Sequence, residues 1–231
     1  NHAAKLRYMS GGKTSVPLVI RTLTAGFVGS FGAQHSQSLE AWLAHTPGIK
    51  IVYPSTPAEA KGLLLSAIDD PDPVVFFESM RAYFAPGPVP EGDYRIPLGQ
   101  ADVKRRGKDL TIITYGWTVG EALAAAETLA KEGVDAEVLD LRTIVPLDVA
   151  AILESVGRTK RAIVLHAATE FGGFGGEVAS IIHSRLHGQL AAPVARVGAR
   201  YTPVPFAAGL ESLHFPQANR VIDAARAMLA R

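Results

Sequence analysis

Short apolar runs alternate with amphipathic segments along this chain of 231 residues. Apolar runs rich in β-branched residues and bounded by turn residues predict buried strands, whereas apolar positions three and four residues apart predict helices. The predicted strands span residues 16–21, 49–53, 73–78, 110–115, 136–141, 161–166 and 193–197. The predicted helices span residues 1–9, 38–45, 56–68, 119–132, 147–156, 177–186 and 218–229. This alternation predicts an α/β fold in which helices cover a mostly parallel sheet.

A proline-rich stretch divides the predicted elements into two groups. Residues 81–98 hold four prolines, and this density predicts a semi-rigid linker between domains. Residues 99–231 contain enough strands and helices for a complete small α/β domain. Residues 1–80 contain three strands and parts of three helices, which amounts to half a sheet. We therefore expect two domains of unequal completeness.

Composition indicates a globular chain with a substantial core, because hydrophobic residues make up 48% and charged residues 19%. The net charge of +1 comes without the basic stripe of a nucleic-acid-binding protein, and no apolar run reaches the length of a membrane span. The absence of cysteine excludes disulfides, thiolate metal sites and cysteine nucleophiles. No targeting segment is visible. The first residues read as the middle of a helix and lack an initiating Met, so we expect a piece of a longer chain.

A glycine-rich segment that ends in His35 is the main candidate for chemistry. Gly26, Gly29 and Gly32 lead into this histidine. We expect His35 at or just before the N-terminus of the helix 38–45, where the helix dipole disfavours a charged imidazole. A neutral imidazole can donate or accept a proton, and the same turn can hold an anionic substrate group. The alternative is that His35 only caps the helix, and the residues alone leave both possibilities open.

Two further patterns indicate packing. Leu39, Trp42 and Leu43 lie at i, i+3 and i+4 in the helix after His35 and predict one apolar face. The run 172–176 holds four glycines between a strand and a helix, but it lacks the G-x-G-x-x-G spacing of a phosphate-binding loop. A tight turn packed against another surface is therefore the favoured interpretation of this run.

Other polar clusters give no definite metal site. Asp69, Asp70 and Asp72 form an acidic helix end, which the helix dipole disfavours. A bound hard cation or solvation of the side chains would each offset this charge, and solvation is the simpler reading. A set of histidines lacks a shared metal-ligand spacing and is expected at the surface or in an interface: His166, His183, His187 and His214.

The order and spacing of several motifs resemble the β chain of the thiamine-diphosphate-dependent 2-oxo acid dehydrogenases. These chains belong to the decarboxylating component of the pyruvate, branched-chain 2-oxo acid and acetoin dehydrogenase complexes. The resemblance covers essentially the whole chain. Its motifs are Arg7-Tyr8-Met9-Ser10-Gly11-Gly12, the segment from Gly32 to Trp42 with Gln34-His35-Ser36-Gln37, and residues 45–57, 60–64, 72–78 and 140–148.

The resemblance implies a fold and a reaction. Residues 1–80 would form the C-terminal half of a pyrimidine-binding domain, and 99–231 a transketolase C-terminal-like domain. Two α and two β chains assemble in this family, and thiamine diphosphate lies between an α and a β chain, with its diphosphate and magnesium held by the α chain. The cofactor attacks the 2-oxo acid, CO₂ leaves, and the acyl group passes to a lipoyl arm of the dihydrolipoyl acyltransferase core. His35 corresponds to the family's active-site histidine, which handles protons and orients the substrate.

The same resemblance implies what the chain lacks. The cofactor-activating glutamate and the aromatic residue that stacks on the pyrimidine belong to the N-terminal half of the first domain. No cofactor-binding residue is therefore expected in this chain, and we do not expect it to be active alone. Several family members hold a potassium ion nearby, at positions that correspond to Leu18, Ala67, Ile68, Asp70 and Asp72. Pro71 and Asp72 depart from the residues that the family often has there.

The resemblance leaves substrate and assembly open. Leu165-His166 before the glycine run is similar to the branched-chain type, although Ala167 replaces a glutamate of that type, and the region around Arg21 is at least as close to acetoin-type chains. The alternatives are another transketolase-superfamily enzyme, or a non-catalytic fragment that serves as a docking module. Members of the family occur in the bacterial cytoplasm or the mitochondrial matrix.

Overall fold

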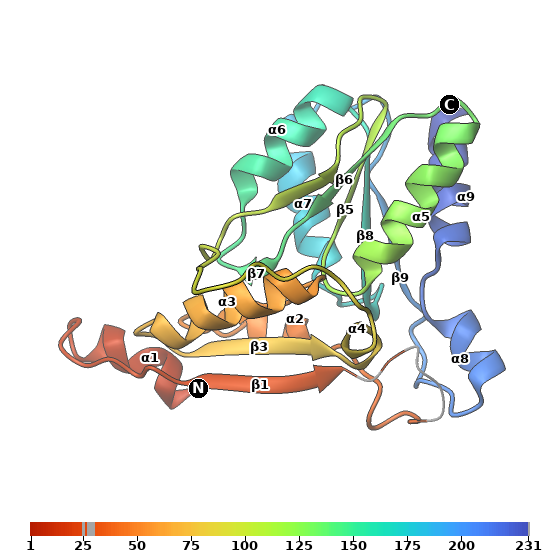
Figure 1. Cartoon of the computed structure of the whole chain (residues 1–231). Helices are drawn as coiled ribbons and strands as arrows, with labels where there is room; N and C mark the ends of the chain where they lie inside the picture. Colours follow the sequence, from red (N-terminus) through yellow and green to blue (C-terminus); the bar gives the residue numbers. More distant parts are fainter. Residues whose placement is uncertain (25, 27–30, 231) are drawn as a thin grey trace.

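Four strands form the first of two sheets in the computed structural model, which describes residues 1–24, 26 and 31–230 (Figure 1). The strand order is β1–β3–β2–β7, with β1 at Val19–Thr24, β3 at Val74–Ser79, β2 at Lys50–Val52 and β7 at Thr143–Val145. The first three strands are parallel, and β7 runs antiparallel to β2. The sequence predicted the three parallel strands but not β7, which comes from the second half of the chain.

The second sheet has the order β4–β6–β5–β8–β9. Its strands are β4 (Asp102–Arg105), β6 (Ala136–Asp140), β5 (Leu110–Thr114), β8 (Ala162–Thr169) and β9 (Ala195–Ala199). β4 is antiparallel to β6, and the other neighbours are parallel. An α/β fold with mostly parallel sheets is therefore confirmed.

Helices cover both faces of the second sheet. In Figure 1, α6 (Val149–Thr159) and α7 (Gly175–Leu186) lie on one face, and α5 (Thr118–Lys131) and α9 (Ala218–Leu229) on the other. Such double coverage explains why every residue of β5, β6 and β8 except Thr169 is buried. Apart from α3 (Pro57–Asp69), the other described helices are short: α1 (His2–Met9), α2 (Glu40–Ala44), α4 (Met80–Tyr83) and α8 (Ala208–His214).

The helix α3 (Pro57–Asp69) begins where its capping residues predict. The hydroxyl of Thr56 accepts a hydrogen bond from the N–H of Glu59, and Pro57 occupies the first helical position. The predicted linker packs along this helix: the N–H of Ile96 donates to the carbonyl of Gly62, and the hydroxyl of Tyr94 donates to the carbonyl of Ala58. The stretch therefore has a fixed path, as its prolines predict.

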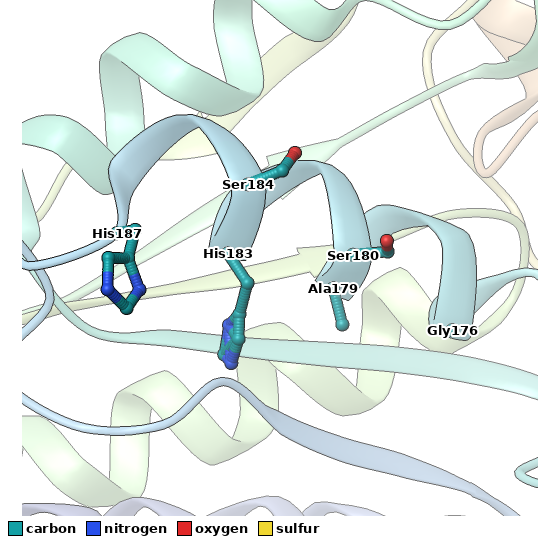
Figure 2. A pocket seen from close by; sticks show the side chains of 6 residues that line it. All are labelled: Gly176, Ala179, Ser180, His183, Ser184 and His187. Carbon is teal, nitrogen blue, oxygen red and sulfur yellow. The ribbon is translucent and has the colours of Figure 1, made fainter.

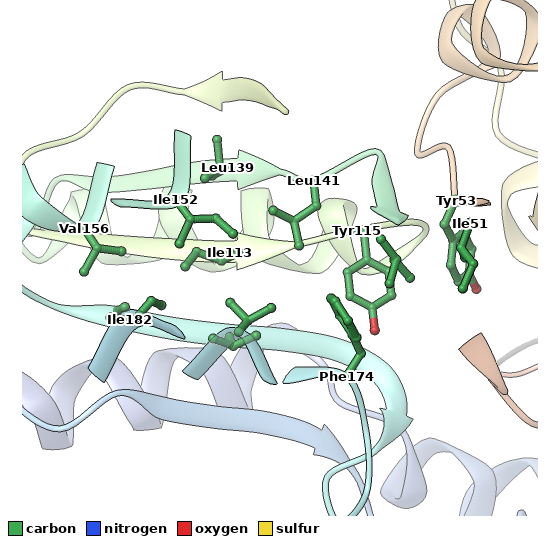
Figure 3. Packing of buried hydrophobic residues seen from close by; sticks show 14 of the residues in the cluster. Ile51, Tyr53, Ile113, Tyr115, Leu139, Leu141, Ile152, Val156, Phe174 and Ile182 are labelled. Carbon is green, nitrogen blue, oxygen red and sulfur yellow. The ribbon is translucent and has the colours of Figure 1, made fainter. Parts of the chain in front are cut away.

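One apolar core runs continuously from the second sheet into the first. Its members include Ile113 and Ile182 between the second sheet and α7, and Ile51, Tyr53 and Phe77 from the first sheet. Figure 3 shows Ile113 and Ile182 at one end of a row of side chains and Ile51 and Tyr53 at the other, with Tyr115 and Phe174 between them. Because both sheets contribute to the same core, their relative position is fixed by buried apolar contacts.

A buried ionic cluster joins α3 to the second sheet. The carboxylate of Glu59 accepts hydrogen bonds from Lys104 on β4 and from Arg142, which precedes β7. The Ser55 hydroxyl lies 2.7 Å from Glu59 and 2.6 Å from the carboxyl of Asp140. One hydroxyl proton serves only one of these oxygens, so the second contact needs a proton on a carboxyl group. Burial, with the nearby charge of Glu59, raises the pKa of Asp140 to about 7, so Asp140 carries that proton at pH values below about 7.

The Asp140→Asn variant should become more stable relative to wild type as the pH rises from 5 to 8. The quantity that grows is the free energy of unfolding of the variant minus that of the wild type. In the wild type, the unfolded Asp140 loses its proton near pH 4 while the folded one keeps it up to about 7, so stability falls through this window. Asparagine imitates the protonated acid and removes this slope, which is on the order of 1.4 kcal/mol per pH unit at most. Urea unfolding at pH 5, 6, 7 and 8 measures the difference; parallel profiles for the two proteins would contradict the assignment.

Candidate functional site

The segment that carries His35 lies between the two sheets' carboxyl ends and α8. Residues 25 and 27–30, which include Gly29, lie outside the described part of the chain. Of the three glycines that precede His35, the structure therefore describes only Gly26 and Gly32. His35 itself is exposed and lies in a turn. The helix α2 begins at Glu40, five residues later than His35 and two later than predicted. The prediction that the helix dipole acts on His35 is therefore wrong.

A cavity of about 690 Å³ lies beside this segment. The two neighbours of His35 in the chain, Gln34 and Ser36, both line it. No aspartate, glutamate, lysine or arginine is among its described lining residues. Its wall consists of three segments: residues 33, 34, 36–39, 41 and 42 before and within α2, residues 167–169, 172 and 173 at the end of β8 and just after it, and residues 199, 201–204, 214 and 215 from the end of β9 to the residue after α8.

Trp42 faces this cavity and the solvent, not the core. Its side chain is 72% exposed, whereas Leu39 and Leu43 of the same predicted face are half-buried. The helix α2 has only five residues, so it spans little more than one turn and cannot bury a full apolar stripe. The predicted apolar face is therefore wrong at Trp42, whose exposed ring borders the candidate site.

Two predicted surface histidines are buried. His166 on β8 is fully buried, and burial lowers its pKa to about 4, so it is neutral at pH 7. Its Nδ1 lies 3.1 Å from the carbonyl oxygen of Ala168, which assigns the ring proton to Nδ1. His214 at the end of α8 is also buried, and desolvation lowers its pKa. The hydrophobic pattern did not predict the burial of either histidine, because a polar residue near the end of a strand or helix is normally expected to be exposed.

The glycine run 172–176 forms a tight turn around the ring of His166. A Cβ on Gly175 would lie 2.4 Å from two atoms of that ring, and a Cβ on Gly173 would lie 2.2 Å from a backbone oxygen. Gly198 on β9 approaches the same ring, where a Cβ would come within 2.9 Å. The interpretation of the run as a packed turn is confirmed. These glycines make room for one buried imidazole.

His183 and His187 are exposed, as predicted, and project from one side of α7 (Figure 2). They line a shallow hollow of about 640 Å³ together with small residues of the same helix. Within residues 1–24, 26 and 31–230, no group of three or more histidine, aspartate or glutamate side chains could hold a metal ion. The pair remains a feature of the helix surface.

The residues predicted to hold potassium meet at the C-terminal end of α3. The carboxylate of Asp70 accepts hydrogen bonds of 2.7 and 2.6 Å from Lys50, and Asp72 pairs with Arg7. The carbonyl of Leu18 accepts the N–H of Val74 at 2.8 Å. Asp69 pairs with Arg95, so three cationic side chains neutralise the acidic helix end, which the sequence did not predict.

Sequence reasoning missed a buried polar pair behind the cavity. The carboxyl of Glu40 is fully buried and accepts a 2.7 Å hydrogen bond from the hydroxyl of Tyr115, which follows β5. Desolvation raises the pKa of Glu40, which favours the neutral acid. No signal in the sequence separates this glutamate from a solvated one at the start of a helix.

Two tandem α/β units with mostly parallel sheets, and an uncharged cavity at the carboxyl ends of β8 and β9, define a protein of the transketolase class. Residues 1–85 match the family described as "Transketolase, pyrimidine binding domain", and residues 99–221 match "Transketolase, C-terminal domain". A solved structure titled "Split gene transketolase, inactive beta4 tetramer" superposes with a TM-score of 0.76 at 24% identity, covering 99% of this chain and 73% of that one. At this identity the likeness shows the fold alone.

Curated relatives narrow the class. The chain is 48% identical to "Acetoin:2,6-dichlorophenolindophenol oxidoreductase subunit beta" of Cupriavidus necator, over 98% of this chain and 67% of that protein. It is 48% identical to "Pyruvate dehydrogenase E1 component subunit beta" of Bacillus subtilis and 46% identical to "2-oxoisovalerate dehydrogenase subunit beta" of the same organism, covering 98% of this chain and 69% of each protein. The chain belongs to this family of thiamine-dependent dehydrogenase β subunits. It spans about two thirds of the length of these relatives.

Family membership implies dependence on thiamine diphosphate and an α-subunit partner. This membership agrees with the resemblance found in the sequence. It does not distinguish the pyruvate, branched-chain and acetoin types, because all three occur among relatives of similar identity. In the described part of the chain, no helix is long and apolar enough to cross a membrane.

Proposed function

We propose that this chain acts as the β subunit in the oxidative decarboxylation of a 2-oxo acid, with transfer of the acyl group to a lipoyl arm. The observation that supports the proposal is the position of His35, exposed in a turn whose neighbours line an uncharged cavity in a chain of this family. An exposed imidazole beside a cavity can exchange protons with a bound substrate, as general acid–base catalysis requires.

The cavity suits the uncharged parts of a cofactor–substrate adduct and not its diphosphate. Its described lining offers amide and hydroxyl groups, including Gln34 and Thr169, but no cationic side chain and no carboxylate pair for magnesium. The diphosphate and its metal are therefore assigned to the α subunit, in an assembly of two α and two β chains. When bound, the cofactor supplies the carbanion that attacks the 2-oxo carbon.

The role of His35 in this proposal is proton transfer and orientation. Its imidazole donates a hydrogen bond to the carbonyl oxygen of the 2-oxo acid and stabilises the negative charge that develops there. During acyl transfer, one sulfur of the lipoyl disulfide takes the acyl group, the S–S bond breaks, and His35 donates the proton that the departing sulfur takes up. No other residue of the described chain is assigned to catalysis.

We propose the division into residues 1–80, a linker 81–98 and residues 99–231, the last of these forming the transketolase C-terminal-like domain. Docking on the acyltransferase core and on a second β chain is proposed as well. Because relatives include a Bacillus subtilis and a mitochondrial Oryza sativa protein, the proposed compartment is the bacterial cytoplasm or the mitochondrial matrix.

The potassium site stays a prediction that the end of α3 can accommodate. The carbonyl groups of the last helical turn, including those of Ala67 and Ile68, have no partner within the helix. Oxygen ligands of this kind, with Asp70 and Asp72, suit a hard monovalent cation. In this prediction Asp70 contributes its backbone carbonyl, as Leu18, Ala67 and Ile68 do, while its carboxylate pairs with Lys50.

The test of the proposed function is turnover by the protein assembled with its α subunit. Reduction of 2,6-dichlorophenolindophenol with added thiamine diphosphate and magnesium is followed separately for pyruvate, 2-oxoisovalerate and acetoin. The proposal expects turnover with at least one 2-oxo acid that depends on the cofactor. Turnover with acetoin alone, or none in a correctly assembled complex, would contradict it and favour an acetoin-cleaving or purely docking role.

A further inference from the structure

A hydrogen bond across the two halves of the molecule lies directly behind the segment that carries His35. Glu40 is the first residue of α2 and follows His35 by five positions. Its Oε1 accepts the hydroxyl of Tyr115 at 2.7 Å, and Tyr115 directly follows β5 of the second sheet. The bond therefore ties the end of the His35 segment to the second sheet.

The hydrogen bond between Glu40 and Tyr115 lies in a buried environment, where polar groups cost free energy to desolvate and where an unpaired polar group is destabilising. Both side chains are almost completely buried, and burial raises the pKa of Glu40 and, well above its usual value, that of Tyr115. The second oxygen of Glu40 has no hydrogen-bond partner within the described residues. A buried carboxyl group with half of its capacity unused destabilises the fold relative to an apolar side chain.

The rings around Tyr115 fix the position of its hydroxyl group. The ring lies parallel to that of His166 at a centroid distance of 6.3 Å and 5.7 Å from the ring of Tyr53. His166 is in turn enclosed by glycines on either side. Tyr115 is thus a fixed donor, and its partner Glu40 belongs to a segment with little regular structure.

The His35 segment itself has few rigid supports. Residues 31–39 contain no helix or strand. The segment contacts residues on either side of α8: a Cβ on Gly26 would come within 2.4 Å of the ring of Phe215, whereas a Cβ on Gly32 would make an ordinary contact of 3.4 Å with the ring of Phe206. These contacts set how near the segment comes but not its register along the cavity. A directional bond at its C-terminal end supplies that register.

We propose that Glu40 is a positioning residue for His35. Its hydrogen bond to Tyr115 holds the first turn of α2, and through it residues 31–39, in register with the cavity wall at the end of β8. The proposal rests on the proposed function in one respect: the effect on turnover requires that His35 acts on the substrate. The effect on the geometry of the segment does not.

The test compares Tyr115→Phe with Glu40→Gln in the complex assembled with the α subunit. Phenylalanine keeps the ring contacts and removes only the donor, so amide hydrogen exchange in residues 31–39 is expected to accelerate and kcat to fall by about tenfold, with KM little changed. Glutamine keeps an oxygen that accepts from Tyr115, so both properties are expected to stay near wild type. Tyr94→Phe, which removes the hydroxyl bonded to Ala58 away from the cavity, is the matched control and should change neither.

Unchanged exchange in residues 31–39 of Tyr115→Phe would overturn the proposal. So would a loss of turnover in Glu40→Gln with normal exchange, because the carboxyl would then act as an acid in its own right. Thermal unfolding of each variant identifies any global loss of structure. If His35→Ala keeps full turnover while Tyr115→Phe still accelerates exchange, the proposed function fails and the positioning role stands.

Discussion

Replacing His35→Ala will lower kcat in the assembled complex by about 10² to 10⁴-fold, the usual contribution of a general acid or base. The imidazole is exposed in a turn, and both of its sequence neighbours line the cavity. Removing an exposed side chain leaves no buried group unsatisfied, so the free energy of unfolding should change by less than about 0.5 kcal/mol. The loss of turnover would then be a loss of chemistry.

Steady-state kinetics with the best 2-oxo acid, together with a native mass of the complex, measures this prediction. His183→Ala is the matched control, because it also removes an exposed imidazole but from α7, away from the cavity. Equal turnover of both variants and wild type would show that the chain contributes assembly surfaces and no catalytic histidine. A variant that no longer assembles would place His35 in the interface with the α subunit.

Replacing Glu59→Ala will lower the free energy of unfolding by about 3–5 kcal/mol, the cost of breaking a buried ion pair from one side. Glu59 is 2% exposed and pairs with Lys104 and, at 2.6 Å, with Arg142. Burial opposes its ionisation, but the hydrogen bonds and charges of these two partners outweigh burial and lower the pKa of Glu59 to about 2. Without the carboxylate, Lys104 and Arg142 lose a buried acidic partner at the junction of α3 with the second sheet and keep Asp102, which is 37% exposed and lies 2.8 Å from each.

Urea unfolding at pH 7 measures the loss. Glu132→Ala provides the comparison, since it breaks the exposed pair with Arg226 and should cost less than about 1 kcal/mol. A loss at Glu59 no greater than that at Glu132 would mean that water enters the cluster and screens it. Below pH 4 the contribution of Glu59 should fade, because the unfolded carboxyl binds a proton before the folded one does.

Much of the fold follows from the sequence because local signals and burial agree. The cap at Thr56 and Pro57 places the start of α3 to the residue, and runs rich in apolar and β-branched residues mark β5 and β8. The strand β7 has three residues, one of them half-buried, and is held by pairing with β2. A strand of three residues is too short to show an alternating hydrophobic pattern, so it can be recognised only from its tertiary contacts.

The candidate site was harder to predict than the fold. The motif around His35 identifies the histidine, but the expected helix start is off by two residues, which removes the dipole argument. Trp42 fits the helical period and still points to solvent, because a five-residue helix lies at the rim of a cavity. The pair of Glu40 and Tyr115 joins residues 75 positions apart, and no local pattern carries that information.

The strand β7 has a consequence for how such chains can be recombined. This strand belongs to the second half of the chain but pairs antiparallel with β2 of the first half. Beside it, the N–H of Tyr53 donates a hydrogen bond of 2.8 Å to the carbonyl of Arg142. A chimera with its crossover in the proline-rich stretch would give β2 a foreign edge partner and would mismatch the ionic cluster around Glu59 at the same time. Functional hybrids between relatives should therefore inherit residues 50–59 and 140–145 from the same parent, even though the intervening segment looks like the natural place to cut.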